Sequence, residues 1–258
     1  MRLVLALDRR EIVSLEIPVG LASVWEHLRE PTLVRRWYGW DRPGIDDETH
    51  AFTDIPTERR EVDHDATTHT LTWPNHDVLA VTAAAHQPHL TRLRITRRSH
   101  EALPVRFDGN MDEVDEDWIA NAHQLQFALA KQLGRDRRTL SVVDLDAGTR
   151  RDRLLDRVGM HGVHGVPVGG HLEARRPDGS MLGGKVIYKS DHQFGIDLHA
   201  VTDALLVVRE APIGSHPPHG TVTAVLSVYG VDSATFDDVA ARWSMWWQAA
   251  GVPAAAFR

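Results

Sequence analysis

The sequence predicts an α+β protein made of two similar lobes in tandem, each an antiparallel sheet followed by a long helix. Three segments of the first half match three segments of the second half, in the same order. The matches are residues 10–20 with 138–148, residues 77–82 with 203–208, and residues 114–134 with 231–251. The spacing between partners shrinks along the chain, so we expect loop deletions in the second lobe. Ordered matches of like elements favour an internal duplication.

The length and composition agree with two globular domains. A chain of 258 residues suits two domains of about 130 residues, so we predict lobe 1 at residues 1–135 and lobe 2 at residues 136–258. The net charge of −7 disfavours nucleic acid and anionic membranes as partners, because both attract basic surfaces. The sequence contains no cysteine, which excludes disulfides and thiolate metal sites.

Neither a membrane span nor a signal peptide is expected. No stretch approaches the roughly 20 apolar residues that cross a bilayer. Charged side chains between Met1 and Ile17 interrupt the apolar core that a signal peptide needs. We therefore expect a cytoplasmic protein.

In lobe 1, residues 11–18 alternate between apolar and polar, which predicts a strand. Two short helices are expected at 21–29 and 31–38, the second beginning at Pro31. Strand-like runs follow at 59–65, 68–73, 78–85 and 90–97. A long helix then begins with the acidic residues of 112–117, which suit the positive end of a helix dipole, and ends at Gly134.

Lobe 2 repeats this plan. Its expected strands are 139–145, 170–176, 181–190, 193–199, 204–210 and 220–229, and its expected helices are 149–158 and 232–250. The Asp178-Gly179 pair is typical of a hairpin turn. The last helix carries Trp243, Trp246 and Trp247 on the side predicted to be buried.

The opening of lobe 1 carries a family resemblance. The segment from Val13 to Leu28 contains Ile17 and Trp25, and the segment Pro31-Thr-Leu-Val-Arg-Arg-Trp37 follows. This spacing resembles the START-like, or SRPBCC, superfamily, and within it the group named after the activator of the heat-shock-protein ATPase. Lobe 2 lacks that opening, so its membership rests on the internal repeat.

The resemblance implies a helix-grip fold in both lobes: an antiparallel sheet curled around a long C-terminal helix, with a cavity between them. Superfamily members bind lipids, sterols, polyketides or hormones in that cavity, and some cyclise or dehydrate polyketides. The fold alone does not choose among these activities.

Ligand-binding candidates are the large aromatic residues expected near the cavity and the residues of the long helices. They are Trp25, Trp37, Trp40, Trp73, Trp118, Ala122, Leu125, Tyr188, Tyr229 and Trp243. Aromatic rings offer a large apolar surface with one polar handle. Helical spacing explains Trp243 equally well as a core or seam residue.

No metal, cofactor or catalytic set is predicted. The sixteen histidines include the pairs His161/His164 and His216/His219, but zinc needs three or four converging ligands. Acid/base candidates stand at strand-like positions, where alternation can equally point them to water; they are His69, His76, Tyr188, Asp197, His199 and Tyr229.

These observations favour a non-catalytic binder or carrier of a small hydrophobic molecule. The alternatives are a polyketide cyclase/dehydratase-like enzyme, and a regulatory, co-chaperone-like interaction protein. Because lobe 2 has diverged from lobe 1, packing or homodimer formation is a candidate role for it. A cavity of a few hundred Å3 is the feature that the binding hypothesis requires.

Overall fold

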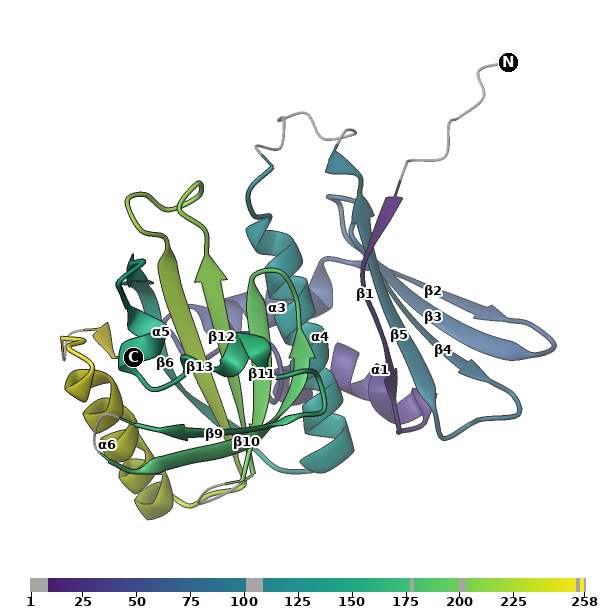
Figure 1. The fold of residues 1–258 in the computed structure, drawn as a ribbon. Coiled ribbons are helices and arrows are strands. Elements are labelled where there is room, and N and C mark those ends of the chain that lie inside the picture. Colours follow the sequence, from purple (N-terminus) through teal and green to yellow (C-terminus); the bar gives the residue numbers. More distant parts are fainter. Residues whose placement is uncertain (1–8, 101–108, 177–178, 200–202, 254–255, 258) are drawn as a thin grey trace. The chain divides into compact units, whose positions relative to one another are not determined.

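The computed structural model describes residues 9–100, 109–176, 179–199, 203–253 and 256–257. The chain divides into two compact units. Unit 1 comprises Met1–Gly39 and Pro43–Gly134, and unit 2 comprises Trp40–Arg42 and Arg135–Arg258. Each unit is an antiparallel sheet followed in the chain by a long helix (Figure 1). The predicted α+β class with two such sheets is therefore confirmed.

Unit 1 begins with a strand and three helices and ends with a long helix. Its elements are β1 (Arg9–Ile17), α1 (Leu21–Arg29), α2 (Pro31–Val34), α3 (Ile45–Asp54), β2 (Thr57–Val62), β3 (Ala66–Thr72), β4 (Val78–Ala84), β5 (Thr91–Arg98) and α4 (Glu113–Lys131). The sheet order is β1-β5-β4-β3-β2. The first strand thus pairs with the last, and the strands between them follow in reverse order.

The core of unit 1 follows from strand alternation. In β4 every second side chain, namely Leu79, Val81 and Ala83, is buried. Helix α4 packs beside β1 and begins at Asp112, whose carboxylate accepts hydrogen bonds from the backbone N–H groups of Val114 and Asp115.

Unit 2 has the same topology with one more strand in its sheet. Its elements are β6 (Arg137–Asp146), β7 (Gly148–Thr149), β8 (Asp152–Arg153), α5 (Leu154–Arg157), a 3-10 turn (Val163–Gly165), β9 (His171–Arg175), β10 (Met181–Lys189), β11 (Gln193–Leu198), β12 (Ala204–Ala211), β13 (Thr221–Tyr229) and α6 (Ser233–Ala249). The sheet order is β6-β13-β12-β11-β10-β9. The three pairs of matched sequence segments therefore occupy equivalent places: first strand, penultimate strand and last helix.

The core of unit 2 lies between its sheet and α6, which crosses one face of that sheet (Figure 1). Phe194, Ile196 and Leu198 of β11 join Trp243 and Trp247 of α6 in one buried cluster. The intervening residues of β11 point to the opposite face. One of them, Gly195, makes room for the ring of Tyr188, because an added Cβ would lie 2.2 Å from Cε1 of that ring. A shift of β11 by one residue would therefore turn its core side chains away from α6.

Three local predictions need correction. Helix α3 was not predicted, although Ile45, Thr49, Phe52 and Thr53 are buried with helical spacing. The helix expected at 31–38 is shorter, since α2 ends at Val34 and turns follow.

The helix expected at 149–158 shrinks to α5, because a tight hairpin of β7 and β8 precedes it. That hairpin needs Gly148 at φ 79°, where an added Cβ would lie 2.2 Å from the carbonyl oxygen of Asp152. The predicted turn at Asp178 lies outside the described residues.

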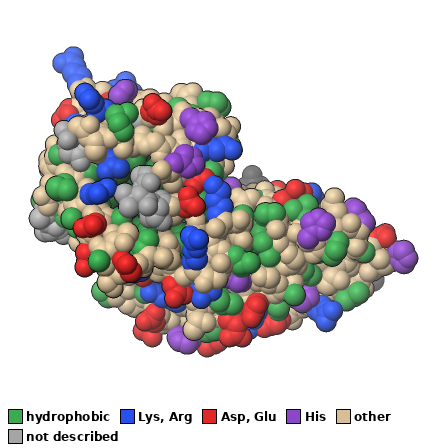
Figure 2. All heavy atoms as spheres, turned by 90° about the horizontal axis from the view of Figure 1, so that it is seen from below, with side chains coloured by type: hydrophobic (Ala, Val, Ile, Leu, Met, Phe, Trp, Pro, Cys, Tyr) green, Lys and Arg blue, Asp and Glu red, His purple; other side chains and the backbone are tan. Residues whose placement is uncertain are grey.

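The surface is mixed in character. Figure 2 shows hydrophobic side chains and charged side chains of both signs interspersed over one face. Among the described residues, no helix is both long enough and apolar enough to cross a bilayer.

Candidate functional site

The main candidate site is a cavity of about 350 Å3 between α6 and the sheet of unit 2. Its walls are mostly apolar side chains from strands β10 to β13 and from α6. The apolar members are Met181, Leu182, Leu198, Ala204, Leu226, Val228, Val239, Trp243, Met245 and Trp246. This is the position at which a helix-grip fold is expected to hold a ligand.

Exposed members of the lining mark the opening of this cavity. Met181 and Met245 are 55% and 53% exposed, unusually high values for large apolar side chains. Arg176 and Arg242 also line it, and the guanidinium of Arg176 lies 4.8 Å from the ring centroid of Trp246. The opening therefore combines flexible methionines, which adapt to ligand shape, with positive charge.

Trp243 lines the cavity and is almost completely buried. Its side chain is 3% exposed, and its indole N–H finds no acceptor among the described residues. The neighbouring Trp246 instead donates its indole N–H to the carbonyl oxygen of Val158 at 2.9 Å. A buried donor without an acceptor is costly.

Unit 1 contains a second cavity of about 290 Å3, bounded by α3, the β3–β4 turn and the start of α4. Its aromatic lining residues are Tyr38, Phe52, Trp73 and Trp118. The polar lining includes Asp77, which is 3% exposed and accepts a hydrogen bond from the Trp118 indole N–H at 3.0 Å.

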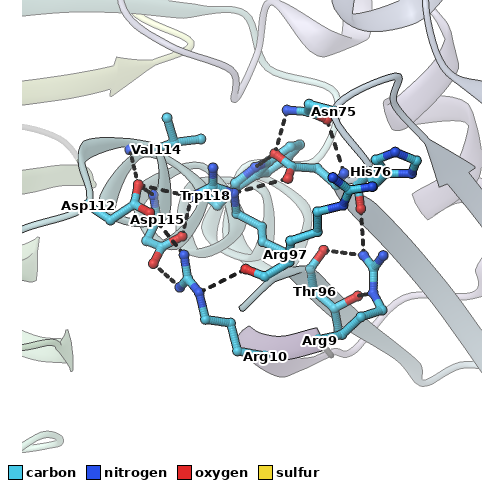
Figure 3. Close-up of polar contacts among 12 residues, drawn as sticks. Arg9, Arg10, Asn75, His76, Thr96, Arg97, Asp112, Val114, Asp115 and Trp118 are labelled. Carbon is cyan, nitrogen blue, oxygen red and sulfur yellow. Dashed lines mark hydrogen bonds and ion pairs between the residues drawn. The ribbon is translucent and has the colours of Figure 1, made fainter. Parts of the chain in front are cut away.

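Asp77 belongs to an ion-pair network, whose members Arg10, Arg97, Asp112 and Asp115 are labelled in Figure 3. Arg97 contacts Asp77 at 3.0 Å and Asp112 at 2.9 Å, and it also pairs with Asp115. Arg10 bridges Asp112 and Asp115 from the other side. The network ties β1 and β5 to the first turn of α4, so it stabilises the wall of the unit 1 cavity.

Two members of this network, Arg97 and Asp112, have pKa values shifted towards their charged forms. Burial would lower the pKa of Arg97, but the hydrogen bond with Asp115 and the charge of Asp77 raise it above its ordinary value. Burial would likewise raise the pKa of Asp112, but the hydrogen bond with His100 and the charge of Arg97 lower it on balance. His100, Asp112 and Asp115 are close enough together to hold a metal ion. Two arginines already neutralise these carboxylates, however, and would repel a cation.

The predicted site residues are distributed over several environments. Trp73 and Trp118 meet in the unit 1 cavity, and Trp243 lines the unit 2 cavity. Trp37 is 1% exposed and donates its indole N–H to the His27 carbonyl oxygen at 2.8 Å. Trp25 meets His69 edge to face, at 4.6 Å between ring centroids.

The remaining predicted residues lie elsewhere in the two units. Ala122 and Leu125 are buried on α4 outside the lining of either cavity. Tyr188 is buried and donates its hydroxyl to the Gln193 side chain at 2.9 Å. Tyr229 is buried in β13, and Trp40 stands in unit 2 with Arg42 at 5.2 Å from its ring centroid.

Sequence reasoning missed Phe52, Asp77 and the arginines at the unit 2 opening. Phe52 depends on α3, whose buried face includes Thr49 and Thr53 and therefore shows no continuous apolar stripe in the sequence. Asp77 and Arg97 are 20 residues apart in the chain, and only strand pairing brings them together. The acid/base candidate Asp197 alternates with the core residues Ile196 and Leu198, so it points away from the α6 cavity.

Helix α4 carries a histidine whose protonation opposes folding. Burial lowers the pKa of His123 to about 4, against an ordinary value of 6.5. The folded state therefore binds the proton more weakly than the unfolded chain, and stability that is present above pH ~6.5 is lost as the pH falls towards ~4. The loss is at most about 3 kcal/mol.

We expect the His123→Gln variant to flatten this decline, as measured by urea unfolding at several pH values. The matched variant His64→Gln, at a side chain that is 95% exposed, should keep the wild-type decline. Equal slopes for the His123→Gln variant and the wild type would contradict the prediction.

Comparison with known proteins gives distant structural similarities. No family model matches the sequence, and no curated protein matches it. DynU16, a protein of the dynemicin biosynthetic locus, is 15% identical over 94% of this chain and 96% of its own, with a TM-score of 0.27. The di-domain aromatase/cyclase BexL of the BE-7585A pathway is 13% identical over 94% and 91%, with a TM-score of 0.28. The di-domain aromatase/cyclase StfQ of the steffimycin pathway is 12% identical over 88% and 86%, with a TM-score of 0.29. At these values the similarity carries no information on activity or substrate.

Proposed function

We propose that this protein binds a small hydrophobic molecule in the cavity between α6 and the sheet of unit 2. The observation that carries the proposal is the apolar cavity of about 350 Å3, which opens beside Met181 and Met245. Ligand cavities typically measure about 300–1,000 Å3 and combine apolar walls with a few polar groups. The volume is at the lower end of that range, so the ligand is small.

The polar side chains that line the unit 2 cavity indicate which polar groups the ligand carries. Arg176 and Arg242 place positive charge in the lining, which favours an anionic or strongly accepting group at the outer end of the ligand. An apolar body with an anionic or oxygen-acceptor group meets this requirement.

Native mass spectrometry of the freshly purified full chain tests this proposal, together with titration by the anionic hydrophobic dye ANS. We expect a co-purifying small molecule or saturable dye binding. The Ala204→Phe variant fills the cavity from β12 and should weaken binding at least about tenfold, a cost of about 1.4 kcal/mol.

The Ala249→Phe variant is the matched control, because Ala249 is exposed on α6 and does not line the cavity. It should bind as the wild type does. Absence of any bound molecule and of dye binding, or equal binding by both variants, would refute the proposal.

The second candidate function is a polyketide cyclase-like enzyme, and two of the similar structures are di-domain aromatase/cyclases. Among the described residues that line the unit 2 cavity there is no carboxylate and no imidazole. Such an enzyme would therefore depend on Arg176 or Arg242 to stabilise a developing enolate. Conversion of a linear poly-β-ketone analogue, and its loss in the Arg176→Met variant, would favour catalysis over carriage.

The narrower resemblance to the activator group, and with it the regulatory hypothesis, stays a prediction. A partner surface would expose a broad apolar patch. Among the described residues eight large apolar side chains are exposed, and four of them line the two cavities: Met181 and Met245 in unit 2, and Ile55 and Val114 in unit 1. The other four, Val62, Leu133, Val168 and Ile213, line neither cavity.

A further inference from the structure

The charged side chains that line the unit 2 cavity all carry the same sign. They are Arg176 and Arg242, and no acidic residue belongs to this lining in the part of the chain that the structure describes. The whole chain has a net charge of −7, so the charge of this lining is opposite to the overall charge. Local positive charge beside an apolar cavity favours an anion over a cation.

The two arginines have different surroundings. The guanidinium of Arg176 lies 4.8 Å from the ring centroid of Trp246, so a cation–π contact already holds it against the wall. Arg242 is exposed, and no hydrogen bond or ion pair joins it to another residue that the structure describes. This includes Asp238, which precedes it by about one turn on α6. Among the described lining residues, Arg242 is therefore the cation that is available to a ligand.

Arg242 lies beside the opening of the cavity. On α6 it comes three residues before Met245, and residues at this spacing are neighbours on one side of a helix. Met245 and Met181 are the exposed apolar members of the lining, whereas Leu182 and Val228 are 1% and 0% exposed. The cavity thus has positive charge at its opening and apolar walls inside.

We propose that the ligand of this cavity is an amphipathic anion, an inference that rests on the binding function proposed above. A single anionic head group contacts Arg242 at the opening, and the apolar body lies inside. The planar guanidinium offers paired N–H donors that match the two oxygens of a carboxylate. A head group at the opening keeps part of its hydration, which avoids the cost of burying a charge.

Three probes with the same alkyl chain and different head-group charge test this proposal on the full chain. At neutral pH octanoate is an anion, octanol is neutral and octylamine is a cation. Binding is measured by isothermal titration calorimetry. We expect octanoate to bind at least about fivefold more tightly than octanol, the effect of an ion pair at a partly exposed site, and octylamine to bind more weakly than octanol. Added salt should reduce the preference for octanoate.

Variants locate the source of this preference. Arg242→Met removes the charge and keeps a long side chain, and it should reduce the preference for octanoate over octanol to less than about twofold. The matched control is Arg151→Met, which removes the same charge from an exposed position of unit 2 outside the lining. It should keep the wild-type preference, because the net charge of the chain changes equally in both variants.

The possible failures of the two proposals differ. Equal affinity of the wild type for octanoate and octanol would overturn the anion proposal and leave the hydrophobic site in place. An unchanged preference in Arg242→Met, or an equal loss of preference in both variants, would also overturn it. Failure of all three probes to bind would count against the cavity itself, and with it the proposed function. Ala204→Phe should weaken the binding of all three probes, because it fills the cavity that they share.

Discussion

Replacing Asp77 with alanine is expected to lower the free energy of unfolding of unit 1 by about 3–4 kcal/mol. Asp77 is 3% exposed, pairs with Arg97 at 3.0 Å and accepts the Trp118 indole N–H at 3.0 Å. Removing the carboxylate leaves one buried donor without its acceptor and one largely buried guanidinium short of a partner. Arg97 keeps Asp112 and Asp115, which places the expected loss towards the lower end of the range for broken buried ion pairs.

Urea unfolding followed by fluorescence measures this loss. The matched control is Glu61→Ala, also in unit 1, where the carboxylate is 55% exposed and pairs with Arg59 on the surface. A surface pair of this kind contributes about 0–1 kcal/mol. A loss for Asp77→Ala no larger than that of the control would show that the network does not stabilise the cavity wall.

Replacing Trp247 with alanine is expected to lower the free energy of unfolding of unit 2 by about 3–5 kcal/mol. Trp247 is 0% exposed, and its ring centroid lies 5.4 Å from that of Trp243 and 5.3 Å from that of Trp246. The substitution leaves a cavity between α6 and the sheet that the surrounding strands fill only in part. Because α6 forms one wall of the ligand cavity, binding should weaken as well.

The neighbouring Gln248→Ala is the matched control, since Gln248 is exposed on the same helix. We expect its free energy of unfolding to lie within about 0.5 kcal/mol of the wild-type value.

Calorimetry also tests the predicted domains, because two units that unfold independently would give two transitions. Asp77→Ala would then shift one transition and Trp247→Ala the other. A single transition shifted equally by both variants would contradict independent folding.

Strand and helix periodicity predicted most of the fold because each element buries one face. The alternation in residues 11–18 corresponds to β1, and the tryptophan spacing of the last helix corresponds to the buried side of α6. The internal matches also predicted the repeated topology. Helix α3 escaped prediction because its buried positions include Thr49 and Thr53, which hydropathy alone assigns to a surface.

The candidate sites were less predictable, because each depends on residues that are distant in the chain. The sequence singled out Trp73, Trp118 and Trp243 as ligand contacts, and the structure places each of them in a cavity lining. It gave no reason to join Trp73 with Phe52, or Arg176 with Arg242. The sequence indicated which aromatic residues suit a ligand. Strand pairing determined which of these residues line the same cavity.

By itself, the sequence determined the α+β class, the repeated order of elements and the buried face of each long helix, because these follow from local periodicity. The tertiary structure alone decided where the cavities described above form and that their linings differ in charge. Glu48, Asp77 and Asp117 come from α3, the β3–β4 turn and α4 in unit 1, whereas Arg176 and Arg242 come from the segment after β9 and from α6 in unit 2. The net charge of a cavity lining depends on residues that only folding brings together, so it cannot be predicted from the local sequence.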